Sequence, residues 1–361
     1  MIRKLLISTL LASALAAGHA AAAGPETLKI LELDMEGGGG TLFVSPEGVS
    51  VLVDTGTPVT PYFPTGLDGA KEAADRIVAA AKSLGLKKID YVIITHYHGD
   101  HVGGVQSLLA RFPVGTFIDH GPNREVMSDP YGPRPGQPSG TIGSYQQYVE
   151  AIKDHKRVIA KAGDVFHFGS LTDTIVIADG KAIARPLPGA GQKGGAQCDL
   201  PPMAADGGVE NAKSVGSIFS FGKVRIAAMG DLTWDREHDL ACPVNKVGKV
   251  NILVVDNHGL GVSTNPAIVA ALDPQIAVFG NGPNKGAVPE VVGHVKEGKR
   301  LEAIWKVHAN LKNPEVDGDP DYIANLGPSP SRGYALRFDI TRGGKIAVSN
   351  GRGFTKSYQA R

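Results

Sequence analysis

The sequence predicts an α/β fold, in which short buried strands alternate with helices and polar turns. Three observations favour this class. Short apolar runs recur along the chain, most of them end at a histidine, aspartate or asparagine, and several are followed by apolar residues at helical spacing. Parallel strands joined by helices place their carboxyl ends at one edge of a sheet. We therefore expect the polar residues that follow these strands to lie close together.

Residues 1–23 are predicted to form a secretory signal peptide, because a basic start (MIRK) precedes an uncharged apolar run and a small-residue segment with Ala20 and Ala23 as cleavage positions. The apolar run is shorter than the roughly 20 residues that a membrane span needs. Residues 24–361 are then expected to form a single domain in the periplasm or outside the cell, with no membrane anchor after cleavage. The sequence leaves the oligomeric state open.

Composition argues against a dedicated nucleic-acid-binding protein. The 361 residues include 37 basic and 36 acidic side chains, and loss of Arg3 and Lys4 with the signal peptide leaves a net charge of −1. Phosphate-binding proteins usually carry a clear basic excess, although local patches such as DHKR (154–157) keep a phosphodiester substrate open. The two cysteines, Cys198 and Cys242, predict either one disulfide or two separate thiols.

The amino-terminal half is expected to open with a meander of three strands, at 28–35, 41–45 and 49–54. A helix over 67–84 then leads to a buried strand over 89–94, and a second helix follows at 102–112. Further strands are predicted at 116–119, 224–229, 251–256, 275–280 and 302–307, which end beside His120, Asp231, His258, Asn281 and His308.

A helix over 264–272 and a terminal hairpin over 334–350 complete the predicted elements. Two long segments, 187–210 and 309–332, are rich in glycine, proline and asparagine. Loops of this length are uncommon unless they are functional or disordered. They are expected either to cover a site or to be solvated connections.

The segment HYHGDH (96–101) places four potential metal ligands at the end of a buried strand. His96 and His98 are two positions apart, so both can face one cation. Gly99 lets the chain bend, after which Asp100 and His101 are expected to face a second position. Imidazole and carboxylate ligands suit zinc, and they also admit iron, manganese or nickel.

HYHGDH resembles the HxHxDH motif of the metallo-β-lactamase superfamily, and LVDTG (52–56), AMGDL (228–232) and VDNHGL (255–260) resemble three further motifs of that superfamily. The resemblance implies an α/β (α+β) fold, specifically a four-layer αββα sandwich with two mixed sheets. It also implies a metal centre, with two zinc ions as the first expectation. The pattern is most similar to the hydrolase domain of DNA-uptake channel proteins.

The resemblance also implies roles for individual residues. Asp231 would bridge the two metals, His258 would bind the second one, and Asp54 would support the metal-binding loop. The complete set of expected ligands is His96, His98, Asp100, His101, Asp231 and His258. The GHTxGH-like segment that usually supplies the third ligand of the first metal has no match between residues 102 and 230.

His120 is the candidate for that third ligand, with Asn211, a water molecule or an empty first site as the alternatives. His308 is either a supporting residue of the centre or a buried polar residue of no function. The remaining histidines are assigned no role: His155 and His167 are expected at the surface or in a strand, His238 and His294 in polar helices, and His19 in the signal peptide.

These residues predict an exported hydrolase in which a metal-bound hydroxide attacks an ester, lactone, amide or phosphodiester. Asp100 would be catalytic, because it can accept a hydrogen bond from the hydroxide and orient it. The substrate would be a small molecule or a phosphodiester. Two alternatives stay open, a mononuclear iron oxidoreductase of the same fold and a metal-binding protein without turnover. The run GGGG (37–40) precedes a strand rather than a helix, so it is not a phosphate-binding loop.

Overall fold

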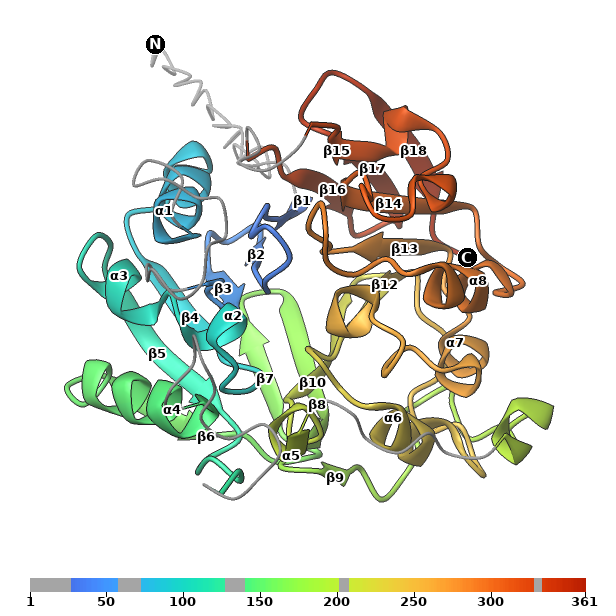
Figure 1. Cartoon of the computed structure of the whole chain (residues 1–361), viewed down its shortest axis with the longest axis horizontal. Helices are drawn as coiled ribbons and strands as arrows, with labels where there is room; N and C mark the ends of the chain where they lie inside the picture. The colour runs from blue at the N-terminus through green and yellow to red at the C-terminus, as the bar shows by residue number, and fades with distance from the viewer. Residues whose placement is uncertain (1–26, 58–72, 127–139, 201–207, 328–332) are drawn as a thin grey trace, which may run out of the picture.

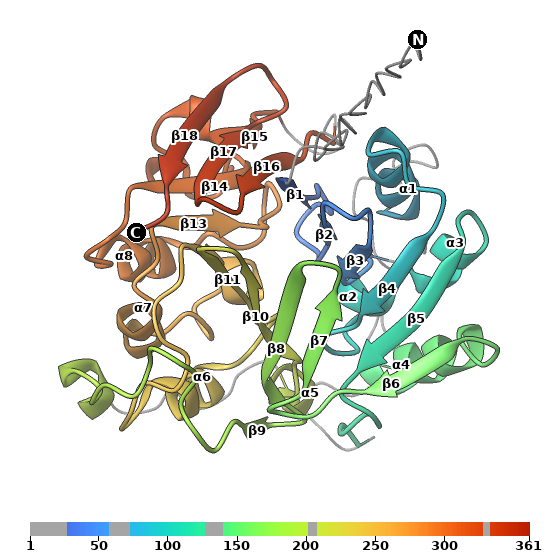
Figure 2. The same ribbon diagram turned by 180° about the vertical axis from the view of Figure 1, so that it is seen from behind.

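The computed structural model describes residues 27–57, 73–126, 140–200, 208–327 and 333–361. Two β-sheets pack face to face, and helices cover the outer face of each sheet (Figure 1). The view from behind shows the same two packed sheets at the centre of the molecule (Figure 2). This is the four-layer αββα sandwich with two mixed sheets that the motifs implied, so the predicted fold is confirmed.

The first sheet has the strand order β18-β17-β16-β1-β2-β3-β4-β5-β6. Neighbours from β18 to β3 are antiparallel, and neighbours from β3 to β6 are parallel. Its strands are β1 (Thr27–Glu32), β2 (Thr41–Val44), β3 (Ser50–Val53), β4 (Ile89–Ile93), β5 (Val114–Asp119), β6 (Lys156–Ile159), β16 (Leu336–Thr341), β17 (Lys345–Ser349) and β18 (Thr355–Gln359).

The second sheet has the order β15-β14-β13-β12-β11-β10-β8-β7, with β9 paired to β8. Strands β11 to β15 run parallel, and the remaining pairs are antiparallel. Its strands are β7 (Val165–Phe168), β8 (Leu171–Ala178), β9 (Lys181–Ala182), β10 (Gly216–Phe221), β11 (Val224–Ala228), β12 (Ile252–Val254), β13 (Ile276–Phe279), β14 (Ala303–His308) and β15 (Ile323–Asn325).

Two groups of helices form the outer layers. The helices are α1 (Ala73–Ser83), α2 (Gly99–Val102), α3 (Val105–Leu109), α4 (Gly140–Ala151), α5 (Gly208–Asn211), α6 (Trp234–Ala241), α7 (Pro266–Leu272) and α8 (Pro289–Lys296), with short 3-10 helices η2 (Ala196–Asp199), η3 (Asp256–Gly259), η4 (Pro314–Val316) and η5 (Pro320–Tyr322). In the described ranges no helix combines the length and the apolar composition that crossing a membrane requires.

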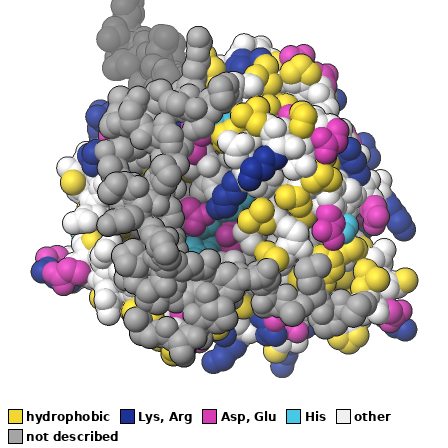
Figure 3. Space-filling view, in the orientation of Figure 1, with side chains coloured by type: hydrophobic (Ala, Val, Ile, Leu, Met, Phe, Trp, Pro, Cys, Tyr) yellow, Lys and Arg dark blue, Asp and Glu magenta, His cyan; other side chains and the backbone are white. Residues whose placement is uncertain are grey.

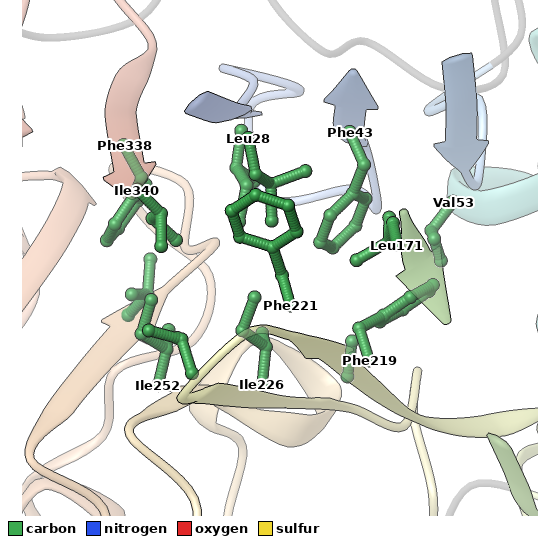
Figure 4. Close-up of a cluster of buried hydrophobic side chains, with 14 of the residues drawn as sticks. Leu28, Phe43, Val53, Leu171, Phe219, Phe221, Ile226, Ile252, Phe338 and Ile340 are labelled. Carbon is green, nitrogen blue, oxygen red and sulfur yellow. The ribbon is translucent and has the colours of Figure 1, made fainter. Parts of the chain in front are cut away.

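The main hydrophobic core lies between the two sheets. Phe43 of the first sheet stacks on Phe219 of the second, with ring centroids 4.4 Å apart. Leu28, Phe221 and Phe338 fill the neighbouring space (Figure 4). A second core lies under α6, α7 and α8, and a third under α1, α3 and α4. Burial on both faces explains the continuous apolar character of the parallel strands.

Most of the predicted elements are confirmed, but the strand expected over 251–256 ends at Val254 and one expected helix is divided. The helix expected over 102–112 is divided at Gly103 and Gly104 into α2 and α3, and the backbone of Gly104 packs directly on Thr55. A β-carbon at residue 104 would lie 2.1 Å from the Thr55 carbonyl oxygen. The first part of the helix expected over 67–84 and the whole signal peptide lie outside the described residues.

Cys198 and Cys242 form a disulfide, with their Cα atoms 5.6 Å apart. Of the two possibilities that the sequence left open, the bridge is therefore confirmed. It ties η2, in the long segment 187–210, to the residue that follows α6. The bridge holds η2 against the helical layer of the second sheet.

Asp173 is a carboxyl group buried between the sheets, on the same side of β8 as Leu171 and Ile175. Ser217 Oγ donates a hydrogen bond of 3.2 Å to one oxygen. Within the described part of the chain, the other oxygen has no hydrogen-bond partner. Burial raises the pKa of Asp173 to about 7, against the smaller lowering effect of Ser217.

Replacing this residue, Asp173→Asn, should stabilise the protein above about pH 7. The pKa of Asp173 is about 7 in the folded protein and 3.8 in the unfolded chain. The contribution of this group to the free energy of unfolding is therefore fully present below about pH 4, and it is lost as the pH rises to about 7. In urea unfolding the variant should exceed the parent protein by up to about 4 kcal/mol at pH 8. The two proteins should match near pH 4, and parallel profiles across this range would contradict a protonated Asp173.

Candidate metal centre

The candidate ligands lie where the carboxyl ends of strands from both sheets meet. The segment 96–101 follows β4 of the first sheet, while Asp231 follows β11 and His258 lies in η3 directly after β12 of the second sheet. Figure 3 shows acidic, basic and histidine side chains gathered near the centre of this face. The convergence expected from the sequence is therefore present, although the strand ends belong to two sheets rather than one.

Four donor atoms form a compact cluster: His101 Nε2, His258 Nε2, Asp231 Oδ1 and Asp100 Oδ2. The two imidazole nitrogens are 3.1 Å apart, and His101 Nε2 is also 3.1 Å from Asp231 Oδ1. Asp100 Oδ2 lies 3.7 Å from His101 Nε2 and 3.5 Å from His258 Nε2. Four ligands placed about 2.1 Å from a tetrahedral zinc ion are roughly 3.4 Å from one another. The cluster therefore fits a single divalent metal.

The opposite nitrogen of each clustered imidazole is held by a protein acceptor. His101 Nδ1 donates to Asp54 Oδ2 at 2.7 Å, and His258 Nδ1 donates to the Gly280 carbonyl oxygen at 3.2 Å. Such contacts fix the tautomer in which Nε2 is free to bind a metal. The predicted supporting position of Asp54 agrees with this geometry.

His96 has the same arrangement on the other side of Asp231. Its Nδ1 is 3.0 Å from Thr95 Oγ1. Its Nε2 is buried, lies 3.9 Å from Asp231 Oδ2, and has no hydrogen-bond partner among the residues the structure describes. The carboxylate of Asp231 thus faces two groups of histidines. Its Oδ1 faces His101 and His258, and its Oδ2 faces His96. This geometry agrees with the predicted bridging position of Asp231.

His98 is more exposed and more distant from the cluster. Its ring packs edge-on against the His96 ring, with centroids 4.9 Å apart. In the described ranges, neither His96 nor His98 belongs to a group of three potential ligands whose donor atoms lie within 4.8 Å of one another. The donor atoms of the first metal position are therefore less closely grouped than those of the second one.

The electrostatics of the cluster keep Asp231 ionised and His96 neutral. Burial alone would raise the pKa of Asp231, but His101 and His258 hold it well below its usual range. Burial and the neighbouring His101 lower the pKa of His96. His96 is therefore neutral, which is the form that binds metals.

His120 lies beside Tyr97 rather than within the four-donor cluster. Its Nε2 forms a buried contact of 2.6 Å with Glu210 Oε1, and its ring packs on the Tyr97 ring at 4.6 Å. Asn211 follows Glu210, and its buried Oδ1 has no hydrogen-bond partner in the described part of the chain. A ligand role for His120 or Asn211 stays a prediction.

His308 belongs to a separate buried cluster. Its Nε2 is 2.8 Å from Asp34 Oδ1, and Asp34 and Glu36 both pair with the Arg76 guanidinium. This cluster anchors the chain just before the glycine run 37–40. His308 therefore lies near that run rather than against the metal-cluster residues.

The other histidines lie apart from the cluster. His155 packs edge-on against Phe117, and His167 is exposed on β7. His238 and His294 lie on α6 and α8.

The glycine run 37–40 and Lys285 were not assigned to the site from the sequence. Gly39 N donates to the Asp100 carbonyl oxygen at 2.9 Å, and a β-carbon at residue 39 would lie 2.7 Å from His101 Nδ1. Only glycine allows this approach. The Nζ atom of Lys285 contacts Asp100 Oδ2. One signal for Lys285 was available: it follows the strand at 275–280, as the ligands follow theirs.

Comparison with known proteins gives a family match and partial relatives. The model of the metallo-beta-lactamase superfamily matches residues 37–191. The beta-lactamase-like protein 2 homolog of Caenorhabditis elegans is 35% identical over 86 residues, 24% of this chain and 22% of that protein. The hydroxyacylglutathione hydrolase of Aeromonas salmonicida is 42% identical over 45 residues, 12% of this chain and 17% of that protein. The chain thus spans about a fifth of the length of these relatives.

Among solved structures, the metallo-beta-lactamase fold protein YhfI from Bacillus subtilis is 13% identical, with a TM-score of 0.43. The match covers 78% of this chain and 96% of that one. The finer resemblance to DNA-uptake channel proteins is not tested by these matches and stays a prediction.

Replacing the shared carboxylate, Asp231→Ala, should remove metal from both sides of the centre. The two oxygens of Asp231 face different histidines, so no other side chain substitutes for both. Elemental analysis after dialysis should show less than about half of the parent metal content, with an unchanged far-ultraviolet circular dichroism spectrum. The matched control is Asp239→Ala, whose carboxylate pairs with Arg236 on α6. Full metal retention in Asp231→Ala would refute the bridging assignment.

Proposed function

We propose that this chain is an exported metal-dependent hydrolase of the metallo-β-lactamase superfamily, whose family model matches residues 37–191. The observation that carries the proposal is the cluster of His101, His258, Asp231 and Asp100, whose spacing suits one tetrahedral metal ion. His96 faces the second oxygen of Asp231 and supports a second ion.

A divalent metal bound there supplies a nucleophile from water at neutral pH and polarises the oxygen of the attacked group. The protein's own residues determine from which side a substrate approaches. His101, His258 and Asp231 are buried, whereas the side chain of Asp100 is 21% exposed. Asp100 therefore lines the open side of the cluster, where it can accept a hydrogen bond from the attacking water.

We propose two zinc ions of unequal affinity. The four donors around Asp231 Oδ1 form the tighter site, and His96, His98 and Asp231 Oδ2 form the weaker one. Iron and manganese accept the same nitrogen and oxygen ligands. Beside the bridging Asp231, the weaker site would take His120, Asn211 or water as its ligand after His96 and His98, and an empty first site is the remaining alternative.

The proposed location is the periplasm or the outside of the cell. The Cys198–Cys242 bridge supports it, because disulfides persist in oxidising compartments. The substrate classes are esters, lactones, amides and phosphodiesters, in a small molecule or a phosphodiester chain. The name of the Aeromonas salmonicida relative, a hydroxyacylglutathione hydrolase, supports hydrolysis as the reaction.

A mononuclear iron oxidoreductase is the second candidate. Two histidines and one carboxylate are the ligand set of many non-haem iron oxygenases, and His101, His258 and Asp231 provide that set within 3.5 Å of one another. Iron content and oxygen consumption by the purified protein would favour this candidate over hydrolysis.

Metal removal tests the proposed function directly. Chelation should abolish hydrolysis of p-nitrophenyl acetate or bis(p-nitrophenyl) phosphate, and added zinc should restore it, because the proposed nucleophile is a water molecule activated by the metal. A control reaction uses zinc without protein. A zinc-loaded protein that hydrolyses neither ester would count against the hydrolase, and oxygen consumption by the iron-loaded form would replace it with the second candidate.

The order of metal affinities gives a separate prediction. His258→Ala should lose the tight equivalent of zinc in a titration against a chromogenic chelator, with affinity reduced by at least about tenfold. His98→Ala should keep the tight equivalent and weaken the second, because His98 lies outside the four-donor cluster. The proposed order would be wrong if both variants lost the same equivalent.

A further inference from the structure

Lys285 lies at the open side of the metal cluster, in the connection between β13 and α8. Its Nζ atom contacts Asp100 Oδ2 and donates a hydrogen bond of 2.7 Å to the Gly37 carbonyl oxygen. The side chain is 37% exposed. The ammonium group therefore stands between a candidate metal ligand and solvent.

The position of Lys285 is fixed by close packing on both sides. Gly282 N donates to the Lys285 carbonyl oxygen at 2.9 Å, which closes the turn, and Ala287 N donates to the His258 carbonyl oxygen at 2.9 Å. On the other side, a β-carbon at Gly37 would lie 3.2 Å from both Cβ and Cδ of Lys285. The glycine thus gives the lysine stem its space, and the ammonium is directed at the cluster.

We infer that Lys285 forms an anion-binding position beside the metal centre and favours substrates that carry a phosphoryl or carboxylate group. This inference rests on the proposed function and adds a substrate class to it. Asp100 Oδ2 is shared between the ammonium and the donor cluster, so a metal bound there weakens the attraction that holds Lys285 to Asp100. An ammonium group has three donors. It can keep its hydrogen bond to the Gly37 carbonyl oxygen. The N–H group that is released from Asp100 can then donate to an oxyanion on the open side of the cluster.

Lys285 is expected to recognise the charge of an anion rather than its shape. Lysine binds phosphate as a point charge on a flexible stem, whereas arginine binds it through two parallel hydrogen bonds. A single such contact at a partly exposed site changes anion affinity by about tenfold. A neutral ester would gain nothing from it. The expected signature is therefore a selective loss for anionic ligands when Lys285 loses its charge.

The test compares Lys285→Gln with Lys285→Arg and with the control Lys299→Gln, whose exposed side chain lies in the turn after α8. Inorganic phosphate and acetate are titrated into the zinc-loaded proteins by isothermal calorimetry. Lys285→Gln should bind one or both anions about tenfold more weakly, Lys285→Arg should recover most of the affinity, and Lys299→Gln should match the parent protein. The anion that responds identifies the substrate group.

A second readout is the zinc affinity of the metal-free proteins. Lys285→Gln should bind zinc more tightly than the parent, because the ammonium no longer competes for Asp100. In turnover, Lys285→Gln should raise the KM for bis(p-nitrophenyl) phosphate about tenfold more than it changes the KM for p-nitrophenyl acetate.

Unchanged affinity for both anions in Lys285→Gln would overturn the inference and leave Lys285 as a counter-ion of Asp100. The anion titrations need no turnover. A parent protein that binds phosphate through Lys285 but hydrolyses nothing would therefore overturn the hydrolase and keep the anion position.

Discussion

The carboxylate of Asp54 is the contact on which the metal centre depends. One oxygen accepts from Thr95 N at 2.8 Å, and the other accepts from Thr95 Oγ1 at 2.8 Å and from His101 Nδ1 at 2.7 Å. Asp54 directly follows β3 and has a left-handed conformation, with φ of 62°, which is unusual for a residue other than glycine. A single buried group therefore joins the end of β3, the end of β4 and the ligand helix α2.

Thr95 extends this contact in two directions. Its hydroxyl group lies against His96 Nδ1, and its carbonyl oxygen accepts from Val215 N at 2.9 Å. The second sheet is thus attached to the first within one residue of a candidate ligand. Because the Phe43–Phe219 stack fixes the spacing of the sheets nearby, the ligands on β4 and β11 are held by packing rather than by the metal alone. Sites supported in this way are preorganised before a ligand arrives.

The sequence predicted what depends on local pattern. The strands that end at His96, Asp231 and His258 were found because an apolar run followed by a ligand has a clear signature. Strands β8 and β10 were not predicted, since inward-facing Asp173 and Ser217 interrupt their apolar alternation. The side chains of Asp173 and Ser217 contact each other inside the core. Such a contact between distant segments cannot be predicted from the local sequence of either segment.

The same limit applies within the centre. Asp54, Asp231 and His258 come from segments with recognisable motifs, whereas Lys285 is a lone lysine in a polar turn. Its contact with Asp100 spans 185 positions of the chain. The pairing of His308 with Asp34 spans 274 positions, and only the tertiary structure reveals it. Which polar residues share a cluster is therefore decided by tertiary packing.

The disulfide has a consequence for the chemistry of the centre. Both cysteines of the chain are joined to each other, so no thiolate competes for the metal and no sulfur ligand is exposed to oxidants. Nitrogen and oxygen donors keep their affinity in air and peroxide, where a cysteine ligand would be converted to a sulfinic or sulfonic acid. A centre built in this way can stay loaded in surroundings that would strip a thiolate site.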